Sequence, residues 1–333
     1  MPKKTKNTAA ETGGNLALSG DGATTDAVVL AESTGHVSHL DIGQITVTDL
    51  DGITINRTKT GISPFVPILK TPTYSQNSNT LSGYAVEIED DASPTGYRHV
   101  GNVSKNYLLL SNEEVRELAV EIAVQSGLNF RESRIFWDGS RFCHIVDFLE
   151  TEEVDEGDEV GLSLITRSSY DKSWRYDCAL MGKRFVCDNG AISGEFFARV
   201  SFKHLASQRA SGVGDDEGPK EEAWKEIVRQ GMTVIDRAPD DLHRFVRGLR
   251  LLKSAEMTDA RLREAWATIP TIGDSIKGQI MSRYVEHEEP TLYGLFNAGT
   301  AVFSHREKMT AADFSNNDAF TSGLLGYAFE ALN

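Results

Sequence analysis

The sequence predicts an α+β fold in which an antiparallel β-meander with one packed helix is followed by a largely helical C-terminal part. Between residues 41 and 210 apolar residues mostly alternate with a period of two, whereas from Glu221 onward they recur with the helical period of 3.6. Strands that come first and helices that follow are typical of this class. We expect a mobile arm at residues 1–40, a mixed domain at 41–210 and a helical region at 211–333 that packs on the sheet.

The expected elements before the first helix are short strands. The arm is rich in Gly, Ala, Thr and Ser and lacks apolar periodicity. Residues 44–55 then alternate well enough for a strand pair turned at Asp51-Gly52 or for one edge strand. Prolines interrupt regular structure in residues 63–77. Further strands are expected at residues 83–90 and 96–110.

The clearest helix in the sequence is expected over residues 112–126. Ser111 and Glu114 have the spacing of a capping box, and Gly127 stands where a helix ends. One face of this helix is apolar and should pack on the sheet. Its residues are Val115, Leu118, Ala119 and Ile122.

Turn signals divide the following residues into strands. Asp138-Gly139 between apolar runs predicts a hairpin with a type I′ turn. The stretch from Glu150 to Glu159 is rich in acids, has no Lys or Arg, and is expected to be a solvated loop between strands. The remaining strands are expected at residues 161–169, 174–182, 184–188 and 191–204.

The segment KRFVCDNGAISG, residues 183–194, permits three interpretations. Asn189-Gly190 favours a hairpin turn, with Cys187 as a small inward-pointing core residue. A disulfide from Cys187 to Cys178 would need a turn at residues 182–183 inside an otherwise unbroken strand. A nucleophilic Cys187 would need a nearby base, and none is identifiable although Lys183 and Arg184 supply positive charge.

The helical region shows six periodic segments. Their apolar residues recur at three and four positions, as expected for helices that each bury one face. The expected helices cover residues 221–236, 240–255, 258–268, 274–287, 292–303 and 317–332.

Charge and motifs exclude several classes of function. The net charge is -15, from 34 basic and 49 acidic residues, which argues against general duplex binding. Nucleotide-binding, zinc-protease and hydrolase motifs are missing, and no cysteine or histidine spacing fits a metal, so no metal or cofactor is expected. The sequence contains neither an apolar span nor a signal peptide, so we expect no membrane partner and a cytoplasmic location.

Two local patterns could nevertheless bind an anion. In helix 240–255 an apolar stripe is flanked by basic residues, which form either a solvated face or an anion-binding surface. Tyr170 and Trp174 stand beside Lys172 and Arg175, which mixes stacking surface with positive charge as single-strand binders do; alternatively, the rings pack on the sheet. The basic and potentially basic residues of the helix are His243, Arg244, Arg247, Arg250 and Lys253.

Several short motifs resemble those of the phage/plasmid-like proteins grouped as the domain-of-unknown-function family 932. The family pattern has an Asp-Gly-Ser turn, a strand ending in Cys-x-Asn, a His, and an Asn-Ala-x-Thr segment followed by a His. Lys172 stands where Gly is usual. The matching residues are Asp171, Ser173, Cys187, Asn189, Gly190, His204, Asn297, Thr300 and His305.

The resemblance implies a phage or plasmid setting, hence the host cell's cytoplasm, and brings no established chemistry. The architecture is also similar, at fold level only, to the core of ring-forming single-strand annealing proteins. The leading hypothesis is therefore a homo-oligomeric DNA-metabolism or recombination protein that binds single-stranded DNA and anneals strands without covalent catalysis. Tyr170 and Trp174 would stack on bases. The expected phosphate contacts are Lys172, Arg175, Lys183, Arg184, Arg199, Lys203, Arg244, Arg247 and Arg250.

Three other hypotheses stay open. The first is a protein-binding module that modifies host machinery or counters a host defence, which suits an acidic chain without catalytic motifs. The second is an enzyme whose unrecognised site combines Asn189, His204, Asn297 and His305. A virion or structural role is the third.

Overall fold

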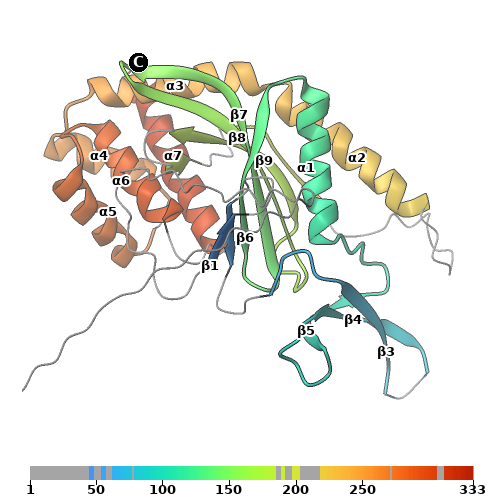
Figure 1. Ribbon diagram of the computed structural model, residues 1–333. Helices are drawn as coiled ribbons and strands as arrows, with labels where there is room; N and C mark the ends of the chain where they lie inside the picture. The colour runs from blue at the N-terminus through green and yellow to red at the C-terminus, as the bar shows by residue number, and fades with distance from the viewer. Residues whose placement is uncertain are drawn as a thin grey trace, which may run out of the picture. The chain divides into compact units, whose positions relative to one another are not determined.

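The computed structural model confirms the α+β class, with two sheets and a helical C-terminal part (Figure 1). The chain divides into residues 1–39 and residues 40–333. The expected N-terminal arm lies outside the described residues. The structure describes residues 45–48, 54–57, 62–76, 79–184, 189–191, 197–202, 218–270, 272–305 and 311–332.

The larger sheet has eight strands among the described residues, in the order β1-β2-β6-β7-β8-β9-β10, with β11 also paired to β9. Neighbouring strands are antiparallel except β2 and β6, which are parallel. The strand pair expected at residues 44–55 is confirmed as β1 and β2. The strands are β1 Ile45–Thr48, β2 Thr54–Arg57, β6 Phe130–Trp137, β7 Arg141–Asp155, β8 Asp158–Ser169, β9 Tyr176–Arg184, β10 Asn189–Ala191 and β11 Arg199–Phe202.

A smaller antiparallel sheet precedes the first helix. Its strands are β3 Ile68–Tyr74, β4 Leu81–Glu89 and β5 Tyr97–Ser104. The expectation that prolines interrupt this region is wrong for Pro72, which lies inside β3; an edge strand tolerates proline because its outer N–H groups need no partner. Gly101 on β5 lies against the backbone of Tyr170, where a Cβ would come within 2.6 Å of the Tyr170 carbonyl oxygen.

All seven expected helices are confirmed. The capping box of α1 is present, because Ser111 Oγ accepts from the Glu114 N–H and the Glu114 carboxylate accepts from the Ser111 N–H. Gly127 ends the helix in the left-handed conformation, at φ 70°. The helices are α1 Asn112–Ser126, α2 Gly218–Ile235, α3 Ala238–Ser254, α4 Asp259–Thr268, α5 Asp274–His287, α6 Leu292–Ser304 and α7 Ala311–Ala331.

The central strands bury both faces. On one face α1 packs on β7 and β8, α2 on β9 and β11, and α3 on β7, β8 and β9. Figure 1 shows α4 to α7 gathered beside the sheet, away from α1 and α2. The helix-facing core includes Phe142, Val146, Leu164 and Leu180. The second face has a separate cluster of Cys143, Ile145, Ile165, Trp174, Ala179 and Met181.

Two turn predictions need correction. The stretch from Glu150 to Glu159 is not a loop, because β7 and β8 run through it and turn tightly at Gly157, whose φ is +74°. Asn189-Gly190 is not the turn of the next hairpin, since Asn189 lies in β10 and pairs with Arg184 of β9. Residues 185–188, which include Cys187, lie outside the described residues.

The hairpin predicted at Asp138-Gly139 is confirmed, but its turn is not type I′. That type needs positive φ at both central residues, and only Gly139 has it, at +96°. Asp138 Oδ1 instead accepts from the N–H groups of Ser140 and Arg141. The Asp138 side chain thus satisfies two backbone N–H groups and stabilises the turn without a second residue of positive φ.

A buried histidine joins the sheet to α1. His144 on β7 is fully buried with Nε2 3.0 Å from Glu132 Oε2, and Arg116 on α1 donates to the same carboxylate from Nε (2.7 Å) and Nη2 (2.9 Å). Burial lowers the pKa of His144 and outweighs the opposing hydrogen bond to Glu132. Burial would raise the pKa of Glu132, but hydrogen bonds from His144 and Arg116 lower it to about 2.

This network predicts acid sensitivity. His144 is neutral in the folded protein, so the free energy of unfolding should fall as pH drops below about 6.5, where the unfolded histidine gains its proton, by up to about 1.4 kcal/mol per pH unit. Glu132 adds a second loss as pH falls from about 4.5, its unfolded pKa, toward about 2. Between pH 7 and 5 the free energy of unfolding, measured with urea, should therefore fall less steeply with decreasing pH in His144→Gln than in the wild type.

The matched control is His99→Gln, which removes an exposed histidine of β5 and leaves the buried network intact. An unchanged pH slope in His144→Gln would contradict this account of the α1–sheet interface.

Candidate functional site

The loop between β8 and β9, residues 170–175, contains the aromatic and basic residues singled out in the sequence. Tyr170 is only 2% exposed; its ring packs edge-on against Trp137, with centroids 5.8 Å apart. Its hydroxyl accepts from the N–H of Asn112 at 2.9 Å. The expectation that Tyr170 stacks on a base therefore conflicts with its burial, and Tyr170 instead joins the loop to α1.

Lys172 has a left-handed backbone, with φ 65°, and is exposed. It is the only non-glycine residue with positive φ among those the structure describes. Asp171 Oδ1 accepts from the Ser173 N–H at 2.9 Å and closes the turn around it. A side chain costs about 1 kcal/mol or more in this conformation. On conformational grounds alone, glycine would be preferred at this position.

Trp174 is held on the second face of the sheet and is 6% exposed. Its backbone N–H donates to Ser169 Oγ at 2.9 Å. Two guanidinium carbons lie over its ring, 5.5 Å from the centroid for Arg167 and 6.0 Å for Arg141. In this structure cations therefore occupy the position expected for a base.

Arg141 is a site residue that sequence reasoning missed. It lies in the neighbouring turn, and its Nε donates to Ser173 Oγ at 3.0 Å across the sheet end. Only the antiparallel register of β7 and β8, in which Arg141 pairs with Ser169, brings the two turns together. The local sequence contains no signal for this contact.

Lys172 and Arg175 remain available to a ligand. Both side chains are exposed, and neither forms an ion pair with an acid in the part of the chain that the structure describes. They stand on either side of Trp174 in sequence. The loop therefore presents two accessible positive charges, which flank a buried tryptophan in sequence.

Lys183 and Arg184, at the end of β9, do not form a common basic patch. Successive strand residues point to opposite faces, and each cation meets a different acid. Lys183 is 8% exposed with Nζ 2.9 Å from Oδ2 of the fully buried Asp147, which also accepts from Ser163 Oγ at 2.8 Å. Arg184 donates to both oxygens of Asp158, at 2.6 and 3.1 Å. The expectation that this pair presents charge for phosphate is therefore not met.

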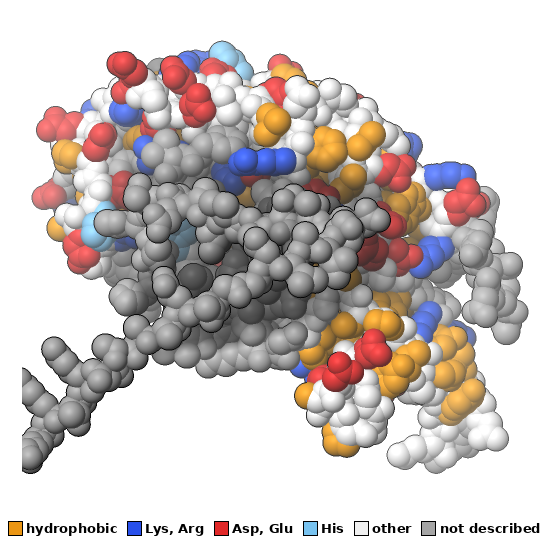
Figure 2. Space-filling view, viewed as in Figure 1, with side chains coloured by type: hydrophobic (Ala, Val, Ile, Leu, Met, Phe, Trp, Pro, Cys, Tyr) orange, Lys and Arg blue, Asp and Glu red, His pale blue; other side chains and the backbone are white. Residues whose placement is uncertain are grey.

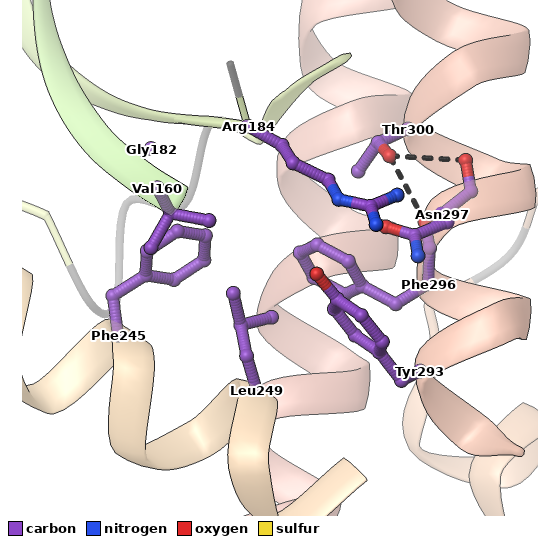
Figure 3. Close-up of a pocket in the computed structure, with 9 residues that line it drawn as sticks. All are labelled: Val160, Gly182, Arg184, Phe245, Leu249, Tyr293, Phe296, Asn297 and Thr300. Carbon is purple, nitrogen blue, oxygen red and sulfur yellow. Dashed lines mark hydrogen bonds between the residues drawn. The ribbon is translucent and has the colours of Figure 1, made fainter. Parts of the chain in front are cut away.

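Arg184 also lines a small pocket between the sheet end, α3 and α6 (Figure 3). Its guanidinium extends between α6 side chains, with its central carbon 5.5 Å from the Tyr293 ring centroid, and Tyr293 donates to Asp158 at 2.8 Å. The cavity volume is about 10 Å³, roughly the room for one water molecule. The lining residues are Val160, Gly182, Arg184, Phe245, Leu249, Tyr293, Phe296, Asn297 and Thr300.

The pocket brings together only part of the family motif. Asn297 and Thr300 are buried on α6, and the Thr300 hydroxyl donates to the Phe296 and Asn297 carbonyls at 3.1 Å each. His305 is exposed at the C-terminal cap of that helix and does not line the pocket. Of the four residues expected for an enzyme site, the pocket holds Asn297; His204 lies outside the described residues.

The other expected phosphate contacts are scattered. Arg199 Nη1 lies 3.0 Å from Asp318 on α7, and Lys203 lies outside the described residues. Arg250 donates to the carbonyls of Glu153 (2.5 Å) and Val154 (3.3 Å). Arg244 and Arg247 are exposed on α3, each with its guanidinium carbon 5.7 Å from the Phe329 ring centroid.

These basic residues form two separate groups. At about 3.4 Å per residue, β9 carries the chain about 27 Å from Tyr176 to Arg184. The loop at residues 170–175 therefore lies at one end of the sheet, and the end of β9 with α3 at the other. The continuous groove expected from the sequence is not present as one surface.

Metal, thiol and membrane chemistry receive no support within the described ranges. Those residues contain no group of three potential ligands that could hold a metal. Cys143 and Cys178 are free and buried, and burial raises the pKa of each thiol to about 12, which is wrong for a nucleophile. None of the described helices combines the length and the apolar composition needed to cross a membrane.

The contact between Lys183 and Asp147 predicts a structural role for this lysine. Among the described residues, Lys183→Met leaves the buried Asp147 with only the exposed Arg131 as a cation, whose Nη2 is 3.7 Å from Oδ2, and should lower the free energy of unfolding by about 3 kcal/mol in urea titrations. The double variant Lys183→Met/Asp147→Leu should recover most of this loss, because it also removes the buried charge. Lys172→Met, at an exposed lysine, is the control, with an expected change within about 0.5 kcal/mol. Equal effects at the two lysines would contradict the buried pair.

Comparison with known proteins agrees with the resemblance seen in the motifs. Residues 99–321 match the family described as Domain of unknown function (DUF932). No curated protein and no solved structure matches the chain. The match covers more than half of the sequence and includes the loop, the end of β9 and the pocket residues of α6. The chain therefore belongs to the DUF932 family.

Proposed function

We propose that this protein binds single-stranded DNA through the loop at residues 170–175 and catalyses no covalent step. Single-strand binders combine positive charge that follows the backbone with aromatic rings that stack on bases. Lys172 and Arg175 supply accessible charge.

Trp174 lies between these two residues in sequence. Its ring, now 6% exposed beneath Arg141 and Arg167, would become available to a base when the side chains over it move. Arg167 is paired with Asp177 and its side chain is only 15% exposed, so Arg141, at 29%, is the guanidinium that could exchange the ring face for a phosphate.

The backbone of Lys172 is the observation that carries this proposal. A left-handed lysine at an exposed loop is less stable than glycine, so stability alone does not explain it. Residues in such conformations cluster at binding sites, where the strain is offset elsewhere. We therefore explain the presence of lysine at this position by an anionic ligand that its side chain binds.

The proposal changes the set of contact residues expected from the sequence. It retains Lys172, Trp174 and Arg175, adds Arg141, and leaves Arg167 paired with Asp177. Tyr170, Lys183 and Arg184 are assigned to the fold, because they are buried or paired with acids.

A phage or plasmid setting, recombination and strand annealing belong to the same proposal. Annealing needs two strands held near each other, which a homo-oligomer would provide by presenting several copies of the loop. The overall charge of -15 supports local rather than general binding, because DNA is repelled elsewhere.

A second candidate is a protein-binding module, favoured by exposed apolar residues on β3. Leu69 is 40% exposed and Tyr74 is 61% exposed at the free edge of the small sheet. A pull-down that recovers one stoichiometric protein without nucleic acid, and loses it in Leu69→Ser/Tyr74→Ser, would favour this candidate over DNA binding.

Fluorescence anisotropy with oligothymidylate at two salt concentrations tests the proposal. Lys172→Gly should weaken binding and reduce the slope of log affinity against log salt by about 0.7, the value for one lost contact on a single strand. The same variant should be more stable by about 1 kcal/mol, because glycine relieves the backbone strain. A variant that is more stable yet binds less well separates binding from folding.

Arg175→Gln removes a charge from the loop and should weaken binding. Its matched control is Arg263→Gln, which removes an exposed arginine outside the loop. Absence of binding near physiological salt, salt-independent affinity, or equal effects of these two variants would refute the proposal.

A further inference from the structure

The acidic tip of the β7–β8 hairpin lies along the basic face of α3. Glu152 Oε1 is 3.5 Å from His243 Nδ1 and 3.6 Å from Arg250 Nη1, and Asp155 Oδ2 is 2.8 Å from Lys253 Nζ. In the upper part of Figure 2, acidic, basic and histidine side chains lie interspersed, where Figure 1 has this hairpin and α3. The acids predicted as a loop thus neutralise the helix predicted to bind anions.

The hairpin covers only one side of this basic face. A residue advances about 100° around a helix, so His243, Arg247 and Arg250 form one stripe, with Arg244 and Lys253 to either side. The hairpin acids meet His243, Arg250 and Lys253. Arg244 and Arg247 lie toward Phe329 of α7 and stay exposed. The hairpin acids therefore meet three of the five basic or potentially basic residues of this face.

These ion pairs are of the kind that another anion can replace. The side chains of His243, Arg250 and Asp155 are 73%, 50% and 60% exposed. Exposed pairs contribute little stability and are screened by salt. The hairpin itself stays anchored, because Val154 and Val160 are only 6% and 1% exposed. Exchange therefore needs movement of side chains and not of the strands.

We infer that the basic face of α3 is a second binding surface for single-stranded DNA, which the protein's own carboxylates occupy when DNA is absent. Phosphates would replace Glu152 and Asp155 on Arg250 and Lys253, next to the exposed Arg244 and Arg247. This inference rests on the proposed function. It adds to it a surface at the opposite end of the sheet and an internal competitor that limits its affinity.

The separation of the two surfaces provides the test. An oligothymidylate of about 4 nucleotides, the smallest site size of one single-strand module, is too short to reach both surfaces at once. One of about 40 nucleotides can reach both. Glu152→Gln/Asp155→Asn removes the competing charges but keeps the shape of the hairpin. This variant should bind the long oligonucleotide about three- to tenfold more tightly and the short one as the wild type does.

The matched control is Glu156→Gln/Glu159→Gln. It removes the same charge from two exposed acids of the same hairpin that have no partner on α3. Its affinity for either oligonucleotide should stay within about twofold of the wild type. Arg250→Gln/Lys253→Met in the Glu152→Gln/Asp155→Asn background should abolish the gain, because it removes the cations that the acids release.

Each outcome decides the inference. Equal gains in the two acid variants would show a general charge effect and overturn it, as would a gain on the short oligonucleotide. Binding to both oligonucleotides without any gain in Glu152→Gln/Asp155→Asn would overturn the second surface while the proposed function stands. If neither the wild type nor any variant binds, both the proposed function and this inference fail.

Discussion

The alternation of side-chain direction along β7, β8 and β9 determines where the charged groups of the sheet lie. Lys183 and Arg184 are adjacent in the chain, yet one neutralises Asp147 on the second face and the other neutralises Asp158 beside α6. The same alternation places Arg167 with Trp174 on the second face and His144 toward α1. A slip of one residue would exchange the two faces and leave buried charges against apolar side chains. The strand register, and not the number of basic residues, decides which charges a ligand can reach.

Accessible positive charge is consequently found outside the strands, in a loop and on a helix. Lys172 and Arg175 lie in a connection between strands, and Arg244 and Arg247 lie on a helix. The acidic residues of this chain repel DNA, and several of them also neutralise cations of the sheet and of α3. A net charge of -15 and local binding of an anion are therefore compatible, because the accessible cations form local groups, one in the β8–β9 loop and one on α3.

Periodicity was sufficient to predict the helices and most strands, because each buries one face and so repeats apolar residues at a fixed interval. It failed where a tertiary partner decides the outcome. The acids around Asp155 form strand instead of loop because α3 supplies cations to them. Arg199 pairs with Asp318, which is 119 residues away, so no local pattern contains that contact. Asn189-Gly190 has the composition of a turn, but its pairing with β9 places it in a strand. The candidate loop was found from composition, whereas the burial of Tyr170 and the contribution of Arg141 depend on the register.

The claim that residues 170–175 contact single-stranded DNA can be tested directly by hydrogen–deuterium exchange of the full chain with and without oligothymidylate. Amides in this loop and in the turn at residues 138–141 should exchange more slowly when DNA is bound, because the ligand covers and orders them. The outer strand β3 should exchange at the same rate in both states. Protection confined to β3, or unchanged exchange in both turns under conditions where DNA is bound, would contradict the account.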